Sequence, residues 1–267
     1  MAEACHKYDT IGIDCVAMNV NDIICLGAEP LALVNYLALE KMRPDLVTEI
    51  MEGLKEGAQE AGVAIVSGET AVMPDVVKGF DLSATAVGLV RKDRIITGEK
   101  TEPGDIVLGL RSSGIHSNGL TLARELLLSR RPEPKVMEGL LRPTRIYVKA
   151  VLRLFTAGLE IRGLAHITGG AYSKLKRIGL RAKVGFHLDS LPKPQWIFRK
   201  IQADGHISHR EMFRTFNMGT GFLIICPKNR ANQAKALLPE IKQVGYVNGS
   251  RTVTVSINGR EIEVEKW

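Results

Sequence analysis

Acidic side chains inside an apolar stretch are the first groups in this sequence that could do chemistry. Asp22 follows Asn19 by three residues within the mainly apolar run 14–26, so a helix would place both on one face. A carboxylate in such surroundings needs a hydrogen-bond donor or a cation nearby. Two interpretations are open: Asp22 accepts a hydrogen bond from a neighbouring loop, or it binds Mg²⁺, which takes carboxylate and amide oxygens as ligands.

A second carboxylate, Glu69, follows the short apolar run 63–66 in the segment Ser67-Gly68-Glu69-Thr70. We expect the run to be a strand and the segment to be a loop at its C-terminal end, where open α/β proteins place ligand chemistry. By itself Glu69 is an ordinary loop carboxylate. Together with Asp22 it predicts a two-carboxylate magnesium site.

Two later segments share one design, in which an apolar strand leads through small residues into a helix. They are residues 112–119, Ser-Ser-Gly-Ile-His-Ser-Asn-Gly, and residues 166–170, His-Ile-Thr-Gly-Gly. Free backbone amides and the positive end of a helix dipole suit a phosphate. His116 and His166 lie in these loops, and each has two interpretations: a structural hydrogen bond, or proton handling and phosphate contact near neutral pH.

The elements that must position these groups follow from periodicity and from turn residues. In the first part of the chain, we expect a largely buried helix over 14–26 that Gly27 and Pro30 terminate. The other expected elements are a strand over 31–39, a helix with Asp45 as its N-cap that ends at Gly62, and strands over 63–66 and 80–86.

Residues 97–105 contain Gly98, Pro103 and Gly104 and predict a boundary between two domains, residues 1–100 and 101–267. Expected strands after it are 106–110, 164–167, 184–188 and 222–226, with helices over 118–129, from 143 to about 158, from 172, and over 230–242. Pro132 breaks the chain, and Asn258-Gly259 predicts a hairpin between 252–257 and 261–264. This order of elements indicates an α/β (α+β) fold with a mixed sheet in the first domain.

Composition excludes several classes of protein. The 267 residues are 45% hydrophobic, and no apolar run approaches the length of a membrane span. The net charge of +7 could indicate a nucleic-acid partner, but only 5% of residues are aromatic and the basic residues are scattered. We interpret the charge as that of a solvated surface, which is compatible with attraction of phosphorylated small molecules. The four cysteines have no metal-site spacing, so we expect reduced thiols in a cytoplasmic protein.

Five motifs, taken in order, resemble the family of aminoimidazole ribonucleotide synthetase, the phosphoribosylformylglycinamidine cyclo-ligase. The first is Asp-Thr-Ile-Gly-Ile-Asp with Val-Asn-Asp and Gly-Ala-Glu-Pro, within residues 9–30. The others are the loop 112–119, Pro-Thr-Arg-Ile-Tyr-Val-Lys at 143–149, His-Ile-Thr-Gly-Gly at 166–170, and Arg-Thr-Phe-Asn-Met-Gly-Thr-Gly at 214–221. Relatives that make selenophosphate or thiamin diphosphate do not share the whole set. Ser67 and Ala171 stand where the family usually has glycine.

The resemblance implies ATP-dependent cyclisation of formylglycinamidine ribonucleotide to aminoimidazole ribonucleotide in purine biosynthesis. ATP phosphorylates the formyl oxygen, an internal nitrogen attacks, and phosphate leaves as the imidazole ring closes. The implied ligands are ATP and Mg²⁺, and the implied assembly is a homodimer whose N-terminal domains form a shared barrel with ATP near the interface. The implied site comprises Asn19, Asp22, Gly68, Glu69 and Thr70 for ATP, Asp22 and Glu69 for the metal, Ser113, His116, Ser117, Asn118, Thr168, Gly169 and Gly170 for substrate, and His116 and His166 for catalysis.

Enzymes of this family carry a substantial segment before the position of Asp9, with the first strands and a glycine-rich acidic loop for ATP and metal. Nothing in residues 1–8 matches it. We therefore expect an incomplete ATP site and little turnover from this chain alone, whereas the second domain from about Thr101 should fold. The alternatives are a non-catalytic homologue that binds nucleotide or a partner chain, and a different enzyme of the same superfamily.

Overall fold

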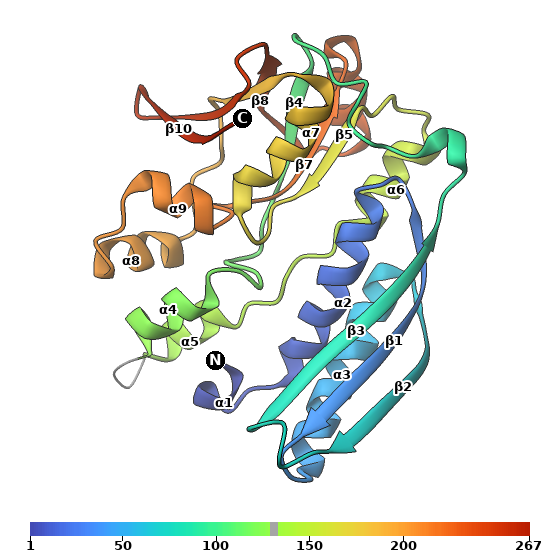
Figure 1. Cartoon of the computed structure of the whole chain (residues 1–267), viewed down its shortest axis with the longest axis vertical. Coiled ribbons are helices and arrows are strands. Elements are labelled where there is room, and N and C mark those ends of the chain that lie inside the picture. Colours follow the sequence, from blue (N-terminus) through green and yellow to red (C-terminus); the bar gives the residue numbers. More distant parts are fainter. Residues whose placement is uncertain (129–132) are drawn as a thin grey trace.

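The computed structural model of the chain describes residues 1–128 and 133–267 and contains two β-sheets with helices packed on them (Figure 1). A three-stranded sheet has the order β2-β1-β3, and a seven-stranded sheet has the order β10-β9-β6-β8-β4-β7-β5. Strand β1 runs parallel to β2 and antiparallel to β3, so the first sheet is mixed, as the sequence predicts. The α/β class is confirmed.

The first half of the chain packs two long helices on one face of the three-stranded sheet (Figure 1). Its elements are α1 (Ala2–Cys5), α2 (Asp9–Ile24), β1 (Glu29–Leu39), α3 (Pro44–Ala61), β2 (Ala64–Val72) and β3 (Phe80–Leu89). Side chains of β1 alternate: Leu33, Asn35 and Leu37 are buried toward the helices, whereas Val34 and Tyr36 are exposed on the other face. One face of this sheet is therefore uncovered in the isolated chain.

Three expectations for the first half need correction. Helix α2 begins at Asp9 rather than Asp14, because the glycine at position 12 lies against α3 and adds a further buried turn. Asp45 is not the N-cap of α3; Arg43 is, and Asp45 lies in the first turn, where its charge complements the helix dipole. The segment 67–70 is not a loop, because β2 continues to Val72 and pairs with β1 throughout.

The second half forms the seven-stranded sheet and its helices. They are η1 (Lys92–Arg94), β4 (Ile106–Arg111), α4 (Leu120–Leu127), α5 (Pro134–Leu140), α6 (Val148–Thr156), β5 (Gly163–His166), η2 (Ala171–Lys174), α7 (Leu175–Ala182), β6 (Gly185–Leu188), α8 (Trp196–Asp204), α9 (His209–Thr215), β7 (Thr220–Cys226), η3 (Lys228–Arg230), α10 (Ala231–Leu237), β8 (Lys242–Asn248), β9 (Thr252–Ile257) and β10 (Arg260–Lys266). The predicted hairpin is confirmed, with Asn258 and Gly259 both at positive φ between β9 and β10.

Several boundaries in the second half differ from expectation. The helix over 230–242 is wrong beyond Leu237, since Pro239 interrupts it and Lys242 opens an additional strand, β8. Residues 143–147 are not helical, because side chains of α2 and of the loop 112–119 hydrogen-bond to their backbone. The helix expected from Asn118 begins at Leu120, and its expected end at Ser129 and the break at Pro132 lie outside the described residues.

The two halves share their buried cores. Ile24 at the end of α2 belongs to the cluster formed by Leu108, Phe222 and the helices α6 and α10. Conversely, Ile146 and Val148 of the second half pack in the cluster between α2, α3 and the first sheet. The last strand of the first sheet, β3, ends at Leu89, and the next strand, β4 of the second sheet, begins at Ile106. The domain division at residue 100 stays a prediction.

Within the part of the chain that the structure describes, no helix combines the length and the apolar character that a membrane span requires.

The contact between α2 and α3 depends on glycine. A methyl group placed on Gly12 would lie 2.1 Å from the backbone nitrogen of Leu54, so Gly12→Ala must push the two helices apart. We expect this change to lower the free energy of unfolding by about 2 kcal/mol or more, although alanine favours an isolated helix by about 1 kcal/mol over glycine. Urea unfolding measures the difference. Glu56→Ala, at an exposed position of α3, is the control, and equal stability of the two variants would contradict this account of the packing.

Candidate active site

Polar side chains on one face of α2 hold the loops of the second half. Asn21 is completely buried; its amide nitrogen donates to the carbonyl oxygen of Arg145 at 2.9 Å, and its amide oxygen accepts from the backbone nitrogen of Tyr147 at 2.8 Å. These two bonds fix the irregular segment 143–147 against the helix. Asp14 lies seven residues earlier, two turns along the same face, and contacts the same segment at Thr144.

Asp22 pairs with His166 across the two halves of the chain. The ring atom Nδ1 of His166 lies 3.0 Å from Oδ1 of Asp22, and its Nε2 lies 3.4 Å from the amide nitrogen of Asn21. Since that amide nitrogen can only donate, Nε2 accepts its hydrogen bond. The ring proton therefore lies on Nδ1, which donates a hydrogen bond to Asp22. Burial lowers the pKa of His166, although Asp22 opposes the shift, so the ring is neutral near pH 7.

The Asp22 carboxylate remains ionised. Partial burial would raise its pKa, but the hydrogen bond from His166 and the charges of Lys174 and Arg177 outweigh burial and lower the pKa. Lys174 lies 4.0 Å from Asp22 and donates to the hydroxyl of Thr168, which is buried. Burial lowers the pKa of Lys174. An anion and a cation thus stand side by side where the two halves meet.

His116 forms a hydrogen bond within its own loop. Its backbone has a positive φ of 59°, and its Nε2 accepts from the backbone nitrogen of Ser113 at 3.1 Å, so the proton resides on Nδ1. That Nδ1 is buried and has no hydrogen-bond partner among the described residues. Burial, assisted by the charges of His166 and Arg145, lowers the pKa of His116 to about 3. The ring is therefore neutral over the physiological range.

The hydroxyl groups of the loop 112–119 are already engaged. Ser113 donates to the carbonyl oxygen of Pro143 at 2.6 Å. Ser117 donates to Asp14 at 3.1 Å and also contacts the hydroxyl of Thr144 at 3.2 Å. The loop is thus fastened to the segment 143–147 and to α2 at the same time.

The two loops predicted from the sequence meet in space. A Cβ on Gly169 would lie 3.4 Å from the side-chain oxygen of Asn118, whose amide nitrogen is buried without a partner among the described residues. Gly169 and Gly170 are exposed, and their backbone amides donate no hydrogen bond to the residues that the structure describes. Gly169 and Gly170 therefore offer free backbone donors beside Asn118.

The motif at 214–221 forms hydrogen bonds with both loops, at Gly114 and Ile115 in the first and at Ile167 in the second. The amide nitrogen of Asn217 donates to the carbonyl oxygens of Gly114 and Ile115, at 2.9 and 3.2 Å. Gly221 must be glycine, because a Cβ there would collide with the hydroxyl of Tyr147 and approach the ring of His116. Asn217 thus fastens the loop 112–119 to the start of β7.

The residues predicted for ATP do not come together within one chain. Asn19 donates to the carbonyl oxygen of Cys15 on its own helix. Glu69 is exposed in the middle of β2 and pairs with Tyr36, so its side chain points to the uncovered face of the sheet. Gly68 points to the opposite face, against Asn35, and Thr70 follows in the same strand.

The predicted pair of metal ligands is also separated. Asp22 lies on α2, which covers the face of the sheet opposite to Glu69. Among residues 1–128 and 133–267 no group of three or more His, Cys, Asp or Glu side chains is placed to hold a metal ion. One chain therefore does not fit a magnesium site built from Asp22 and Glu69.

Sequence reasoning missed four residues of this site: Asp14, Asn21, Thr144 and Lys174. A signal existed for the first two, since they are polar, lie seven residues apart in an apolar helix and must share a face. No comparable signal existed for Thr144 or Lys174, because their roles depend on contacts with distant segments.

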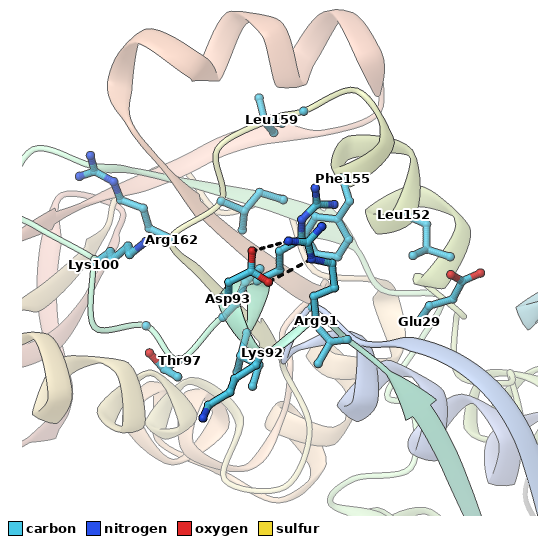
Figure 2. A pocket seen from close by; sticks show the side chains of 18 of the residues that line it. Glu29, Arg91, Lys92, Asp93, Thr97, Lys100, Leu152, Phe155, Leu159 and Arg162 are labelled. Carbon is cyan, nitrogen blue, oxygen red and sulfur yellow. Dashed lines mark hydrogen bonds and ion pairs between the residues drawn. The ribbon is translucent and has the colours of Figure 1, made fainter.

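A cavity of about 1090 Å³ lies elsewhere, between the linker 89–100 and helix α6 (Figure 2). Leu152, Phe155 and Leu159 form an apolar wall, and Arg91 and Asp93 pair with each other at 2.9 Å in its mouth. None of the predicted site residues lines this cavity.

The low pKa of His116 predicts a pH-dependent stability. Unfolded histidine has a pKa near 6.5, so between pH 6.5 and about 3 the unfolded state binds a proton that the folded state does not. The free energy of unfolding should therefore fall with decreasing pH in this window, by up to about 1.4 kcal/mol per pH unit from His116. His116→Gln should reduce this slope, measured by urea unfolding from pH 7 to 4. The exposed His209→Gln should not, and equal slopes in all three proteins would contradict the buried neutral ring.

Family comparisons agree with the motifs. The AIR synthase related protein, N-terminal domain, matches residues 1–90, and the AIR synthase related protein, C-terminal domain, matches residues 102–258. A phosphoribosylformylglycinamidine cyclo-ligase of Pyrococcus horikoshii is 54% identical over 89% of this chain and 71% of its own length. The cyclo-ligase of Methanothermobacter thermautotrophicus is 52% identical over 99% of this chain and 78% of its own length.

Solved structures share the fold at low identity. A hydrogenase maturation protein HypE superimposes with a TM-score of 0.77 at 22% identity, over 96% of this chain and 83% of its own. A thiamine monophosphate kinase from Aquifex aeolicus has a TM-score of 0.70 at 19% identity, over 96% of this chain and 82% of its own. These two comparisons bear on architecture alone.

Proposed function

Since the chain belongs to the family of AIR synthase related proteins, we propose that it is a phosphoribosylformylglycinamidine cyclo-ligase. The reaction closes the imidazole ring of aminoimidazole ribonucleotide from formylglycinamidine ribonucleotide and ATP, in purine biosynthesis, and we place it in the cytoplasm. The observation that supports it most is the docking of both predicted substrate loops on one helix, through Asp14 to Ser117 and through Asp22 to His166.

The loop 166–170 is the proposed phosphate subsite. The exposed amides of Gly169 and Gly170 are available donors, and Lys174 brings a positive charge beside Thr168. Oriented amides and a cation stabilise the charge on a phosphate that is bound or leaving. In this proposal Asn118 turns its unpartnered amide nitrogen toward the same ligand.

The two histidines have different proposed roles from simple acid catalysis. Both rings are neutral near pH 7, so neither stores a proton for release. His166 donates a hydrogen bond from Nδ1 to Asp22, which fixes the orientation of that carboxylate. His116 shapes the loop and retains one unpartnered N–H donor, which can stabilise a developing negative charge on the substrate.

ATP is the proposed phosphoryl donor, and its site involves the uncovered sheet face. HypE, a solved structure with the same fold, was crystallised in complex with ATP. Gly68, Glu69 and Thr70 lie in the edge strand β2, so they fit the expectation that ATP binds near an interface between two copies. Because Asp22 and Glu69 do not converge in one chain, no step is assigned to a metal ion.

A turnover assay tests the function. Whatever turnover the purified chain shows should yield ADP and aminoimidazole ribonucleotide, and it should require ATP and formylglycinamidine ribonucleotide together. Asp22→Asn removes the charge that holds His166 and Lys174, and we expect turnover to fall by about 100-fold with the fold retained. The exposed Asp189→Asn is the control. A folded protein that binds neither substrate would contradict the proposal.

We also propose a homodimer that covers the three-stranded sheet. Val34, Tyr36 and Val87 are 40%, 37% and 62% exposed, and they alternate with residues that pack on the helices, so all three lie on the uncovered face. Contiguous exposed apolar side chains on a sheet favour association. A second copy of the same face supplies the matching apolar surface.

The dimer predicts a selective effect of charge. The double change Val34→Asp and Val87→Asp should convert a dimer into a monomer, because two charges on each copy would be buried at the interface. Light scattering at micromolar concentration measures the mass. Leu180→Asp, on an exposed position of α7, should leave the mass unchanged. A wild-type monomer under these conditions would sink the proposed interface.

A further inference from the structure

Asp14 occupies an unusual position between the two halves of the chain. Its Oδ1 accepts from the backbone nitrogen of Thr144 at 2.8 Å, from the hydroxyl of Thr144, and from the hydroxyl of Ser117 at 3.1 Å. Burial raises the pKa of Asp14, and the hydrogen bonds from Thr144 and Ser117 oppose that shift. Three donors thus converge on one oxygen of a carboxylate that belongs to α2.

Proton accounting then determines what this cluster presents to a ligand. The hydroxyl of Thr144 donates a hydrogen bond to Asp14. The hydroxyl of Ser117 donates either to Asp14 or to the hydroxyl oxygen of Thr144, which lies 3.2 Å away. In both arrangements the Ser117 oxygen has no proton left to donate outward and presents only lone pairs.

The cluster is not sealed. Ser117 is partly exposed, whereas Thr144 is buried. The second oxygen of Asp14, Oδ2, accepts no hydrogen bond from the described residues and is not among their buried, unpartnered atoms. Two oxygen acceptors, Oγ of Ser117 and Oδ2 of Asp14, therefore remain beside the loop 112–119.

Such a cluster suits a donor and repels an anion. A phosphate would bring oxygen lone pairs against those of Ser117 and Asp14, and it has better partners at Gly169, Gly170 and Lys174. A group that carries N–H or O–H protons would pair with both acceptors.

We propose that Asp14, Ser117 and Thr144 form an acceptor subsite for a proton-bearing group of the substrate, either the amidine nitrogen or a ribose hydroxyl. The inference rests on the proposed cyclo-ligase function and adds to it a specificity element on α2. Asp14 and Ser117 contact the substrate, and Thr144 fixes the orientation of both side chains.

Calorimetric binding of formylglycinamidine ribonucleotide, without turnover, tests the subsite. Asp14→Asn keeps the size of the side chain but replaces an acceptor with a donor, and we expect the dissociation constant to rise about 10-fold, as for a lost hydrogen bond. Ser117→Ala should change it in the same direction. Asp93→Asn, on the exposed linker, is the control and should bind as the wild type does.

Substrate analogues distinguish the two donor groups. If the amidine binds here, the analogue with an amide in its place should bind wild type and Asp14→Asn equally. If a ribose hydroxyl binds here, the corresponding deoxyribose analogue should show that equality instead.

Two results would overturn the subsite: unchanged affinity in both variants, or equal weakening of inorganic phosphate, which would make it a phosphate contact. Thermal unfolding verifies that the variants fold, and Ser117→Ala carries the test if Asp14→Asn does not. Absence of ribonucleotide binding to the wild-type protein would instead overturn the proposed function, and the subsite with it.

Discussion

The hydrogen bonds from the polar face of α2 to the second half of the chain are the constraint on which the rest of the structure depends. Asp14, Asn21 and Asp22 each hold a different partner, namely Ser117 with Thr144, the segment 145–147, and His166. A buried polar group without a partner costs free energy comparable to a lost hydrogen bond, so the buried Asn21 and the partly buried Asp14 hold the two halves in one specific arrangement. The helix is buried from both sides as a result.

Close packing of α2 makes this arrangement precise. Gly12 and Gly53 let α2 and α3 approach to backbone contact on one side. On the other side, Ile24 enters the core of the seven-stranded sheet, and Ile146 and Val148 enter the core of the first sheet. Because neither core is complete without the other half, a shift of α2 would disturb the loops and both cores together.

The proposed site combines two kinds of surface. Near Gly169, Gly170 and Lys174 it offers donors and positive charge, which suit phosphate. Near Asp14 and Ser117 it offers hydrogen-bond acceptors. A phosphorylated ribonucleotide with a proton-bearing reactive end has both kinds of group, so the polarity of the site can orient it. The neutral His116 and His166 fix neighbouring groups through hydrogen bonds, His116 to the backbone of Ser113 and His166 to Asp22.

The sequence alone determined the family, the α/β class and the two loops, because these depend on motifs and on periodicity among residues that are close together in the sequence. It also located Asp22, His116 and His166, whose residue types are unusual in their surroundings. Only the tertiary structure decided that Glu69 lies in a strand on the face opposite to Asp22, since pairing with β1 extends β2 through the expected loop. Likewise, Asp14 and Thr144 are 130 positions apart, and only folding brings a carboxylate to a hydroxyl over that distance.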